Sequence, residues 1–222
     1  MNKKLIIWDF DGVIADTEKL WLQNRMELIN EKYGVNWDFK TTISFLAGMS
    51  DKTKKEILQK LGINTDEDFW NEVLIRDFQK MIKGFVLTPG IEDIFKLREF
   101  EQCIATGGTT SKTEKKIETA GIKKYFPPEK VFTADMVAYG KPDPDLFLLA
   151  AEVMGFKRED CFVVEDSLAG MNAGIRAGMN VIAFLGSDLY SGIHIEKEIR
   201  NLGVSEIFYN MKDVKDYLLR KL

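Results

Sequence analysis

The sequence lacks the features that mark several common classes of protein. It has two cysteines among 222 residues, which excludes a disulfide framework as its source of stability. No stretch approaches about 18 consecutive apolar residues, which excludes a typical membrane-spanning helix. Neither sign of charge dominates, because 31 basic and 35 acidic residues are well mixed and give a net charge of −4. We therefore expect no partner among nucleic acids or membranes.

The two cysteines, Cys103 and Cys161, lie in apolar segments with strand character. We expect buried free thiols rather than a disulfide, which fits a reducing compartment and a cytoplasmic location. Apolar residues make up 45% of the chain, enough for a substantial core. This composition predicts one domain, or one domain with a small insertion, and we expect a monomer.

Short apolar segments alternate with helical patterns along most of the chain. Alternation of this kind predicts an α/β fold with a doubly wound, Rossmann-like parallel sheet. The predicted strands cover residues 4–9, 101–106, 130–134, 160–165, 180–185 and 206–209. Helical patterns lie between most of them or follow them, at residues 113–120, 143–154, 167–177 and 212–222.

Residues 17–85 interrupt this alternation with helical patterns alone. They predict four helices, at residues 20–33, 39–46, 52–60 and 67–82. In the first, one packed face is predicted by the spacing of five residues: Trp21, Met26, Leu28, Ile29 and Tyr33. We expect a core domain of residues 1–16 and 86–222, and an inserted helical-bundle domain of residues 17–85.

Two aspartates directly follow the first predicted strand. Asp9 and Asp11 are two residues apart, so their side chains should point the same way while Phe10 packs on the opposite side. Two like charges that converge at a strand end repel each other unless a cation holds them. This pattern therefore suggests chemistry rather than folding alone.

Three later segments place polar residues at the same edge of the predicted sheet, where ligand sites assemble in doubly wound folds. Thr106 and Gly107 end the second strand, Lys141 lies beside prolines, and Glu165 and Asp166 end a later strand. Each segment alone also fits a plain turn, a solvated lysine or a helix cap. Together with Asp9 and Asp11, however, the acids supply the hard oxygen ligands that Mg²⁺ prefers.

These segments resemble the four motifs of the haloacid dehalogenase superfamily. The first motif is Asp9 to Glu18, which is similar to DxDGVxxDTE, and Thr106 matches the second. Lys141 in GKPDPD matches the third motif, and Glu165-Asp166 in EDSLAGMNAGIRAGM matches the fourth. The helical insertion resembles the small cap of subfamily I. The resemblance covers essentially the whole chain, and the form of the fourth motif resembles that of β-phosphoglucomutase-like sugar-phosphate phosphatases.

The resemblance implies a mechanism. Asp9 would attack phosphorus and form an aspartyl phosphate, and Asp11 would act as acid and then as base. Mg²⁺ would be held by Asp9, the backbone carbonyl of Asp11, and Asp166, with Glu165 as a ligand or as a neighbour of the ligands. The phosphoryl oxygens would be bound by Thr106, Gly107 and Lys141.

The substrate class that the resemblance implies is a small phosphorylated metabolite, such as a sugar phosphate or a phosphorylated sugar acid. Dehalogenases of the superfamily lack the second aspartate, so Asp11 favours phosphoryl chemistry. Trp21 stands where the mutase has a histidine, Asp51 stands where it has an arginine, and the only histidine here is His194. These departures favour a phosphatase over a mutase, and the intact acids favour an enzyme over a silent binding module.

The inserted helices hold the candidate substrate contacts. Gly48, Met49 and Trp21 are expected to face the site, although an aromatic residue at the position of Trp21 also fits a bundle core. Three cations are candidates for contact with an anionic substrate group or, alternatively, for a solvated helix face: Lys52, Arg76 and Lys80.

Overall fold

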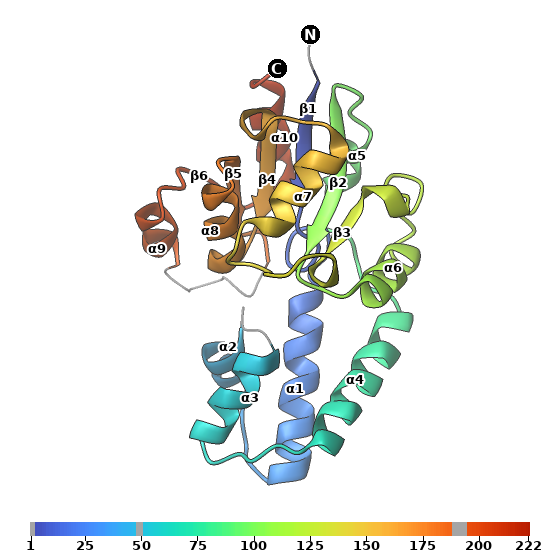
Figure 1. Ribbon diagram of the computed structural model, residues 1–222. Coiled ribbons are helices and arrows are strands. Elements are labelled where there is room, and N and C mark those ends of the chain that lie inside the picture. Colours follow the sequence, from blue (N-terminus) through green and yellow to red (C-terminus); the bar gives the residue numbers. More distant parts are fainter. Residues whose placement is uncertain (1–2, 48–50, 188–194) are drawn as a thin grey trace. The chain divides into compact units, whose positions relative to one another are not determined.

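A computed structural model describes residues 3–47, 51–187 and 195–222 (Figure 1). The chain divides into two compact units. Unit 1 combines Met1–Asp16 with Val86–Leu222, and unit 2 is Thr17–Phe85. Each unit has its own core.

Unit 1 is built around a parallel sheet, to which the described residues contribute six strands in the order β3-β2-β1-β4-β5-β6. These strands are β1 Lys4–Trp8, β2 Phe100–Thr106, β3 Val131–Thr133, β4 Cys161–Glu165, β5 Asn180–Phe184 and β6 Glu206–Phe208. The predicted α/β fold and its parallel sheet are confirmed, with strand ends that differ by one residue at most. The chain proceeds outward from β1 through β2 to β3 and then crosses to β4 on the other side of β1. Ligand sites form where the strand order reverses in this way.

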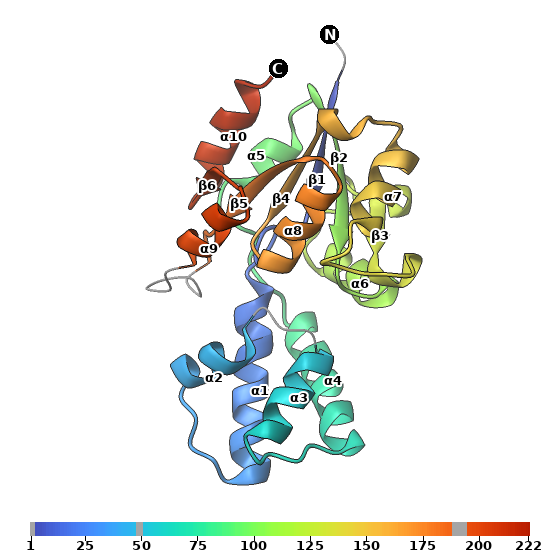
Figure 2. The same cartoon turned by 60° about the vertical axis from the view of Figure 1, so that its left-hand side comes forward.

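Helices cover both faces of this sheet (Figures 1 and 2). Helices α7 (Asp145–Met154) and α8 (Leu168–Arg176) pack on one face, and α5 (Ile91–Phe95) and α10 (Met211–Leu219) lie on the other. Two further helices are α6 (Thr110–Thr119), which follows β2, and α9 (Glu196–Asn201), which packs against α8.

Side chains of β1 alternate between the two faces. Leu5 and Ile7 join the core beneath α7, whereas the Trp8 ring meets Phe95 of α5 with 5.9 Å between centroids. Because both faces are buried, β1 is apolar from Leu5 to Trp8, and this run ends at Asp9. Cys103 of β2 and Cys161 of β4 are buried free thiols, as predicted.

Unit 2 consists of helices that are inserted after β1, as the sequence predicts. They are α1 Thr17–Tyr33, α2 Phe39–Leu46, α3 Asp51–Lys60 and α4 Glu67–Ile82. Asp38 and Asp66 cap α2 and α4, because their carboxylates accept from the backbone N–H groups of Thr41 and Phe69 at 2.7 and 2.8 Å. Both caps fix where the chain turns into a helix.

The buried face of α1 differs from the predicted one. Leu28 and Ile29 are fully buried, but the other three residues of that set are only half-buried: Trp21, Met26 and Tyr33. Asn24 and Arg25 are buried instead, at 0% and 3% exposure. Tyr33 nevertheless packs against Phe69 of α4 with 5.7 Å between ring centroids, so the packed face is apolar in part and also carries charge that a partner on α4 neutralises.

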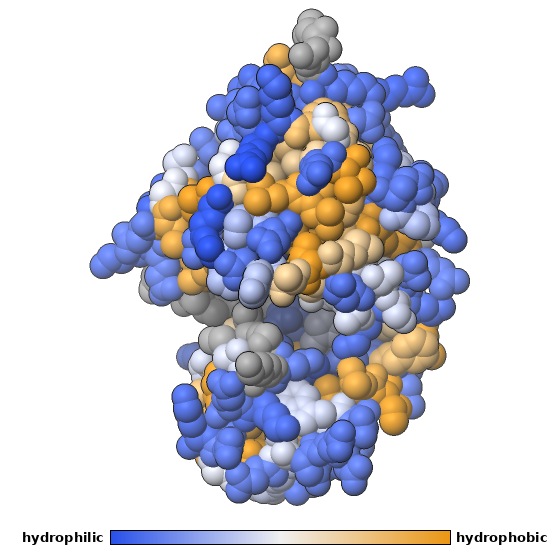
Figure 3. All heavy atoms as spheres, viewed as in Figure 1, coloured by the Kyte–Doolittle hydropathy of each residue, from blue (hydrophilic) through white to orange (hydrophobic). Residues whose placement is uncertain are grey.

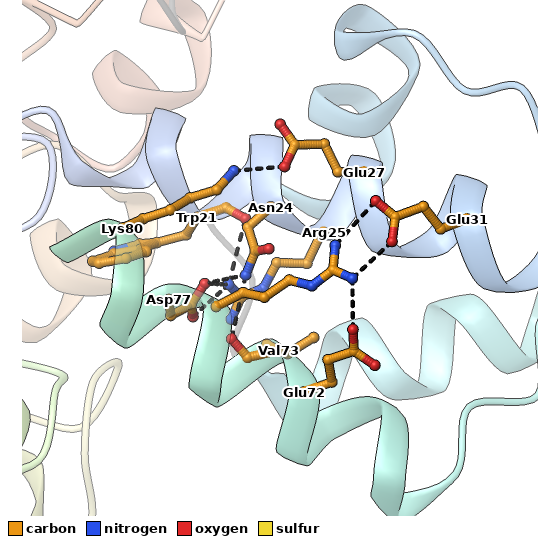
Figure 4. Close-up of polar contacts among 10 residues, drawn as sticks. Trp21, Asn24, Arg25, Glu27, Glu31, Glu72, Val73, Asp77 and Lys80 are labelled. Atoms are coloured by element: carbon orange, nitrogen blue, oxygen red, sulfur yellow. Dashed lines mark hydrogen bonds and ion pairs between the residues drawn. The ribbon is translucent and has the colours of Figure 1, made fainter. Parts of the chain in front are cut away.

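That partner is Asp77 of α4 (Figure 4). Nη1 of Arg25 donates to both carboxylate oxygens of Asp77 at 2.5 Å, and Nδ2 of Asn24 donates to Asp77 at 2.6 Å and to the carbonyl of Val73 at 3.2 Å. Buried ions of opposite charge are tolerated when they are paired in this way. This network joins α1 to α4 through the middle of unit 2.

On the face that Figure 3 shows, hydrophilic residues surround apolar areas, one over unit 1 and another over α4. The large exposed apolar residues on that helix are Leu74, Ile75, Phe78 and Ile82. Among the described residues, every helix is too short or too polar to cross a bilayer.

Candidate active site

Three strands of unit 1 deliver polar side chains to the same edge of the sheet. The N–H of Asp9 donates to the carbonyl of Val164 at 3.0 Å, so Asp9 continues the ladder between β1 and β4. Thr106 ends β2 and Glu165 ends β4, on either side of β1. Parallel pairing therefore places these side chains beside one another.

Lys141 joins the two acids at the centre of this edge. Its ammonium donates to Asp9 Oδ1 at 2.6 Å, to Glu165 Oε1 at 2.7 Å and to the carbonyl of Ala105 at 3.1 Å. The same nitrogen lies 4.9 Å from the ring centroid of Phe147. The side chain is only 9% exposed, so these contacts fix an ammonium group between β1, β2 and β4.

Burial and crowding of like charge perturb the pKa values of this pair. Burial raises the pKa of Asp9 to about 7; Lys141 opposes this rise, while Glu165 and Asp11 add to it. Burial alone would lower the pKa of Lys141, but Asp9 and Glu165 together raise it above its ordinary value. The Lys141 ammonium thus faces two carboxylates, Asp9 and Glu165, and this group of three keeps a surplus of negative charge.

Glu165 is buried at 1% exposure and held on both of its oxygens. Oε1 contacts Lys141, and Oε2 accepts from the backbone N–H and the hydroxyl of Ser167 at 2.7 and 2.9 Å. A Cβ at Gly170 would fall 1.7 Å from Oε1, so the carboxylate fills the place of that missing side chain. Its position is therefore fixed by α8 as well as by Lys141.

Asp166 packs against the loop that follows β1. A Cβ at Gly12 would lie 1.9 Å from Asp166 Oδ2, and Gly12 has a φ of +84°, which favours glycine. The close approach brings the 6% exposed Asp166 beside the peptide that follows Asp11. The described residues contain no set of three Asp, Glu, His or Cys side chains grouped closely enough to hold a metal ion by themselves.

The donor set nevertheless fits magnesium. Mg²⁺ is commonly bound by one or two carboxylates, with waters and substrate oxygens in its remaining positions, so a three-carboxylate cage is not required. This edge offers the carboxylates of Asp9 and Asp166 and the backbone carbonyl of Asp11, which are all hard oxygen donors. A divalent cation would also offset the surplus negative charge.

The turn after β2 leads into α6, and a residue from outside that helix caps its first turn. Thr106 is buried at 1% exposure, its Oγ1 accepts from the N–H of Gly108 at 3.4 Å, and Gly107 is exposed. The carboxylate of Asp135 accepts from the N–H of Thr110 at 3.1 Å and caps α6. The exposed turn between β2 and α6 is thereby fixed in place.

Asp11 contacts a different lysine from Asp9. The ammonium of Lys116, in α6, donates to Asp11 Oδ1 at 2.6 Å and to Oδ2 at 2.5 Å. The Asp11 side chain is 26% exposed, whereas that of Lys116 is 6% exposed. Each of the two aspartates that follow β1 therefore has its own ammonium partner.

The residues proposed to contact substrate from unit 2 have different outcomes. Trp21 is half-buried in α1, and its carbonyl accepts from Arg25 at 3.4 Å. Arg76 pairs with Glu31 and Glu72 at 2.7 and 2.5 Å. Lys80 pairs with Glu27 at 2.7 Å (Figure 4), so acids of unit 2 already hold both cations. Gly48, Met49 and the side chain of Lys52 lie outside the described residues.

Sequence reasoning missed Lys116, Asp135 and the pair of Arg25 and Asp77. A signal existed for Lys116, because helical spacing places it on one face with Thr113 and Ile117, which are both buried. A lysine on the inward face of an amphipathic helix indicates an internal partner. Asp135 is 25 residues from its partner and carried no such pattern.

Comparisons with known proteins identify the class. The model of the family described as haloacid dehalogenase-like hydrolase matches residues 6–184. A fructose-1-phosphate phosphatase from Escherichia coli K12 is 27% identical over 179 residues, which cover 80% of this chain and 94% of that protein. A 6-phosphogluconate phosphatase from the same strain is 25% identical over 184 residues, 81% of each chain.

The chain is thus a hydrolase of the phosphatase class. It belongs to the haloacid dehalogenase-like hydrolase family, so the family expected from its motifs is confirmed. The fold agrees, since a haloacid dehalogenase-like protein of unknown function from Agrobacterium tumefaciens superposes with a TM-score of 0.86 at 24% identity, over 99% of both chains. Members of the family typically need Mg²⁺.

Proposed function

We propose that the chain is a Mg²⁺-dependent phosphatase that hydrolyses phosphomonoesters of small metabolites through an aspartyl-phosphate intermediate. The observation that carries this proposal is the Asp9 carboxylate, which extends beyond the central strand and is fixed by Lys141 at 2.6 Å. Its immediate surroundings hold a second aspartate, a buried ammonium group and further oxygen donors. This combination suits attack on a phosphoryl group.

The two aspartates divide the chemistry. An oxygen of Asp9 attacks phosphorus while the bond from phosphorus to the leaving oxygen breaks, and Asp11 donates a proton to that oxygen. Asp11 then takes a proton from water, whose oxygen attacks phosphorus as the bond to Asp9 breaks. The products are inorganic phosphate and the dephosphorylated metabolite, and both aspartates return to their starting state.

The phosphoryl oxygens need donors as charge develops on them. We assign this role to the Thr106 hydroxyl, the Gly107 amide and the Lys141 ammonium, which come from the ends of β2 and from the loop after β3. Lys141 also holds Asp9 in place, so one side chain orients the nucleophile and neutralises the group that it attacks. Removal of Lys141 would therefore impair both binding and turnover.

Mg²⁺ would be bound by Asp9, Asp166 and the backbone carbonyl of Asp11, and it would supply positive charge next to the phosphoryl group. The four acids assigned to the metal site, Asp9, Asp11, Glu165 and Asp166, then have unequal roles. Both oxygens of Glu165 already accept hydrogen bonds from Lys141 and Ser167. We therefore place Glu165 behind the ligands, where it positions Lys141.

We infer a sugar phosphate or a phosphorylated sugar acid as the substrate. The supporting facts are the relatives named for fructose 1-phosphate and 6-phosphogluconate, each over about four fifths of this chain. A mutase is disfavoured, because Asp51, where the mutase has an arginine, lies 3.3 Å from Arg25 as an anionic partner. We also propose that the protein is a cytoplasmic monomer. The two buried free thiols and the balanced charge support this proposal.

The decisive experiment measures phosphate release from a panel of phosphorylated metabolites, each with Mg²⁺ and with a chelator. The panel includes hexose phosphates, 6-phosphogluconate, glycerol phosphate, nucleotides and β-glucose 1-phosphate. Metal-dependent release from one or a few compounds supports the proposal. Formation of glucose 6-phosphate from β-glucose 1-phosphate would instead identify a mutase, and a folded protein inert toward the whole panel would contradict the phosphatase.

A further inference from the structure

Lys116 is an unusual residue for the inward face of a helix. Its residue exposure is 5%, whereas the side chain of the preceding Lys115 is 37% exposed and pairs with Glu118 on the outward face of α6. Burial of an ammonium group is costly unless a partner of opposite charge is held in good geometry. The interior position of Lys116 thus depends on what its ammonium contacts.

That contact is made to both oxygens of one carboxylate. Lys116 Nζ lies 2.6 Å from Asp11 Oδ1 and 2.5 Å from Oδ2, and it also lies 5.2 Å from the ring centroid of Phe10. Contact to both oxygens restricts rotation of the carboxylate, which a single hydrogen bond would permit. The backbone of Asp11 is fixed as well, through a bridge to Ala15.

The helix that carries Lys116 begins at the proposed phosphate-binding edge. Helix α6 starts at Thr110, three residues after Gly107, and Asp135 caps its first N–H. The elements that would bind the phosphate and hold Asp11 are therefore joined by less than three turns of one helix. Sites built on rigid elements keep reacting groups in register more accurately than flexible loops do.

We propose that Lys116 is a positioning residue, which orients the carboxyl group of Asp11 toward the leaving oxygen of the bound phosphate ester. This inference rests on the proposed function, because it assigns Lys116 a purpose only if Asp11 transfers the proton. Proton transfer requires the donor within hydrogen-bond reach of its target. Loss of the orienting contact should therefore slow reactions that need the proton and spare those that do not.

The test compares substrates with poor and good leaving groups. Glycerol phosphate and fructose 1-phosphate have alkoxide leaving groups, which need protonation. The leaving group of p-nitrophenyl phosphate is a stable phenolate, which does not. We expect Lys116→Met to lower kcat/KM for the alkyl phosphates by about tenfold or more and for p-nitrophenyl phosphate by less than about twofold. The quantity kcat/KM is informative because it reports the steps up to the first phosphoryl transfer.

Three variants serve as controls. Lys115→Met removes the neighbouring lysine on the outward face and should leave kcat/KM unchanged for the alkyl phosphates and for p-nitrophenyl phosphate. Lys116→Arg keeps a cation with several donors and should restore a large part of the loss. In the Asp11→Asn background, Lys116→Met should produce no further change in alkyl phosphate turnover, because the group that it orients is already gone. An equal loss for both substrate classes, or no loss, would overturn the proposal.

A crystal structure of each protein gives a readout that does not depend on activity. Asp11 should occupy one side-chain conformer in the wild type, within hydrogen-bond distance of Lys116, and several in Lys116→Met. An unchanged single conformer in the variant would overturn the positioning role even if the chain proved to be a phosphatase. Conversely, a wild type inert toward all phosphate esters would refute the proposed function and leave this structural comparison to decide on Lys116.

Discussion

Gly170 lies in the first turn of α8, where an alanine would ordinarily favour the helix by about 1 kcal/mol. A Cβ at this position falls 1.7 Å from Glu165 Oε1 and 2.0 Å from its Cδ. No small rotation clears such an overlap, because the whole carboxyl group occupies the space. We therefore expect Gly170→Ala to destabilise unit 1, against the helix preference.

The magnitude follows from what Glu165 must give up. It is 1% exposed and accepts from Lys141 at 2.7 Å and from the N–H and hydroxyl of Ser167 at 2.7 and 2.9 Å. A hydrogen bond to a charged group contributes about 1.5–3 kcal/mol. Loss of two of these bonds exceeds the helix gain, which gives a net destabilisation of about 2–5 kcal/mol.

Thermal unfolding followed by circular dichroism measures the effect. For a chain of this size each kcal/mol shifts the midpoint by about 2–4 °C, so we expect a fall of about 4–20 °C. Gly140→Ala is the control, since the nearest described neighbour of its added Cβ is Ala134 Cβ at 3.9 Å, and it should shift the midpoint by no more than about 2 °C. A Gly170→Ala protein as stable as the wild type, or more stable, would refute the reasoning.

Three further predictions concern the proposed nucleophile, the metal and unit 2. Asp9→Asn should abolish phosphate release while the unfolding midpoint stays within a few degrees of the wild type, and near-normal metal-dependent activity would contradict the assignment. Gly12→Ala adds a Cβ 1.9 Å from Asp166 Oδ2 at a φ of +84° and should displace that carboxylate. The affinity for Mg²⁺, measured by calorimetry, should therefore fall at least about tenfold. An unchanged affinity would exclude Asp166 as a ligand. Asp77→Ala leaves Arg25 buried without its main partner and should lower the free energy of unfolding of unit 2 by about 3–5 kcal/mol. Urea unfolding followed by tryptophan fluorescence measures this loss. A loss below about 1 kcal/mol would show that the pair is dispensable.

The sheet and the convergence of polar side chains at its edge could be predicted from sequence because both depend on local patterns. A strand buried on both faces must be apolar throughout, so the change from Trp8 to Asp9 marks where the sheet ends. Asp9, Thr106 and Glu165 follow three such runs, and parallel topology then brings their ends together. Lys141, which lies between two of these acids, needed the motif resemblance as well, since a lysine beside prolines is common at turns.

The remainder depended on partners that are distant in sequence. Arg25 and Asp77 are 52 residues apart, and neither position indicates burial until the other is known. Lys116 and Asp11 are 105 residues apart, and the contact is visible only once α6 is placed beside the loop after β1. The short helices α5 and α9, of five and six residues, also escaped because such segments are too brief to show a period.

The balance of charge at the strand edge links the proposed metal to the substrate. Acids from two segments meet there, Asp9 with Asp11 and Glu165 with Asp166, and the ammonium groups of Lys141 and Lys116 are each already bound to a carboxylate. A phosphate monoester adds negative charge to a site where burial and neighbouring acids already raise the pKa of Asp9. Repulsion of this kind disfavours entry of the anion unless further positive charge enters with it. On the proposed function, the divalent cation is therefore needed to admit the phosphate as well as to aid its transfer, and the acids that make the site reactive are also what make it depend on a metal.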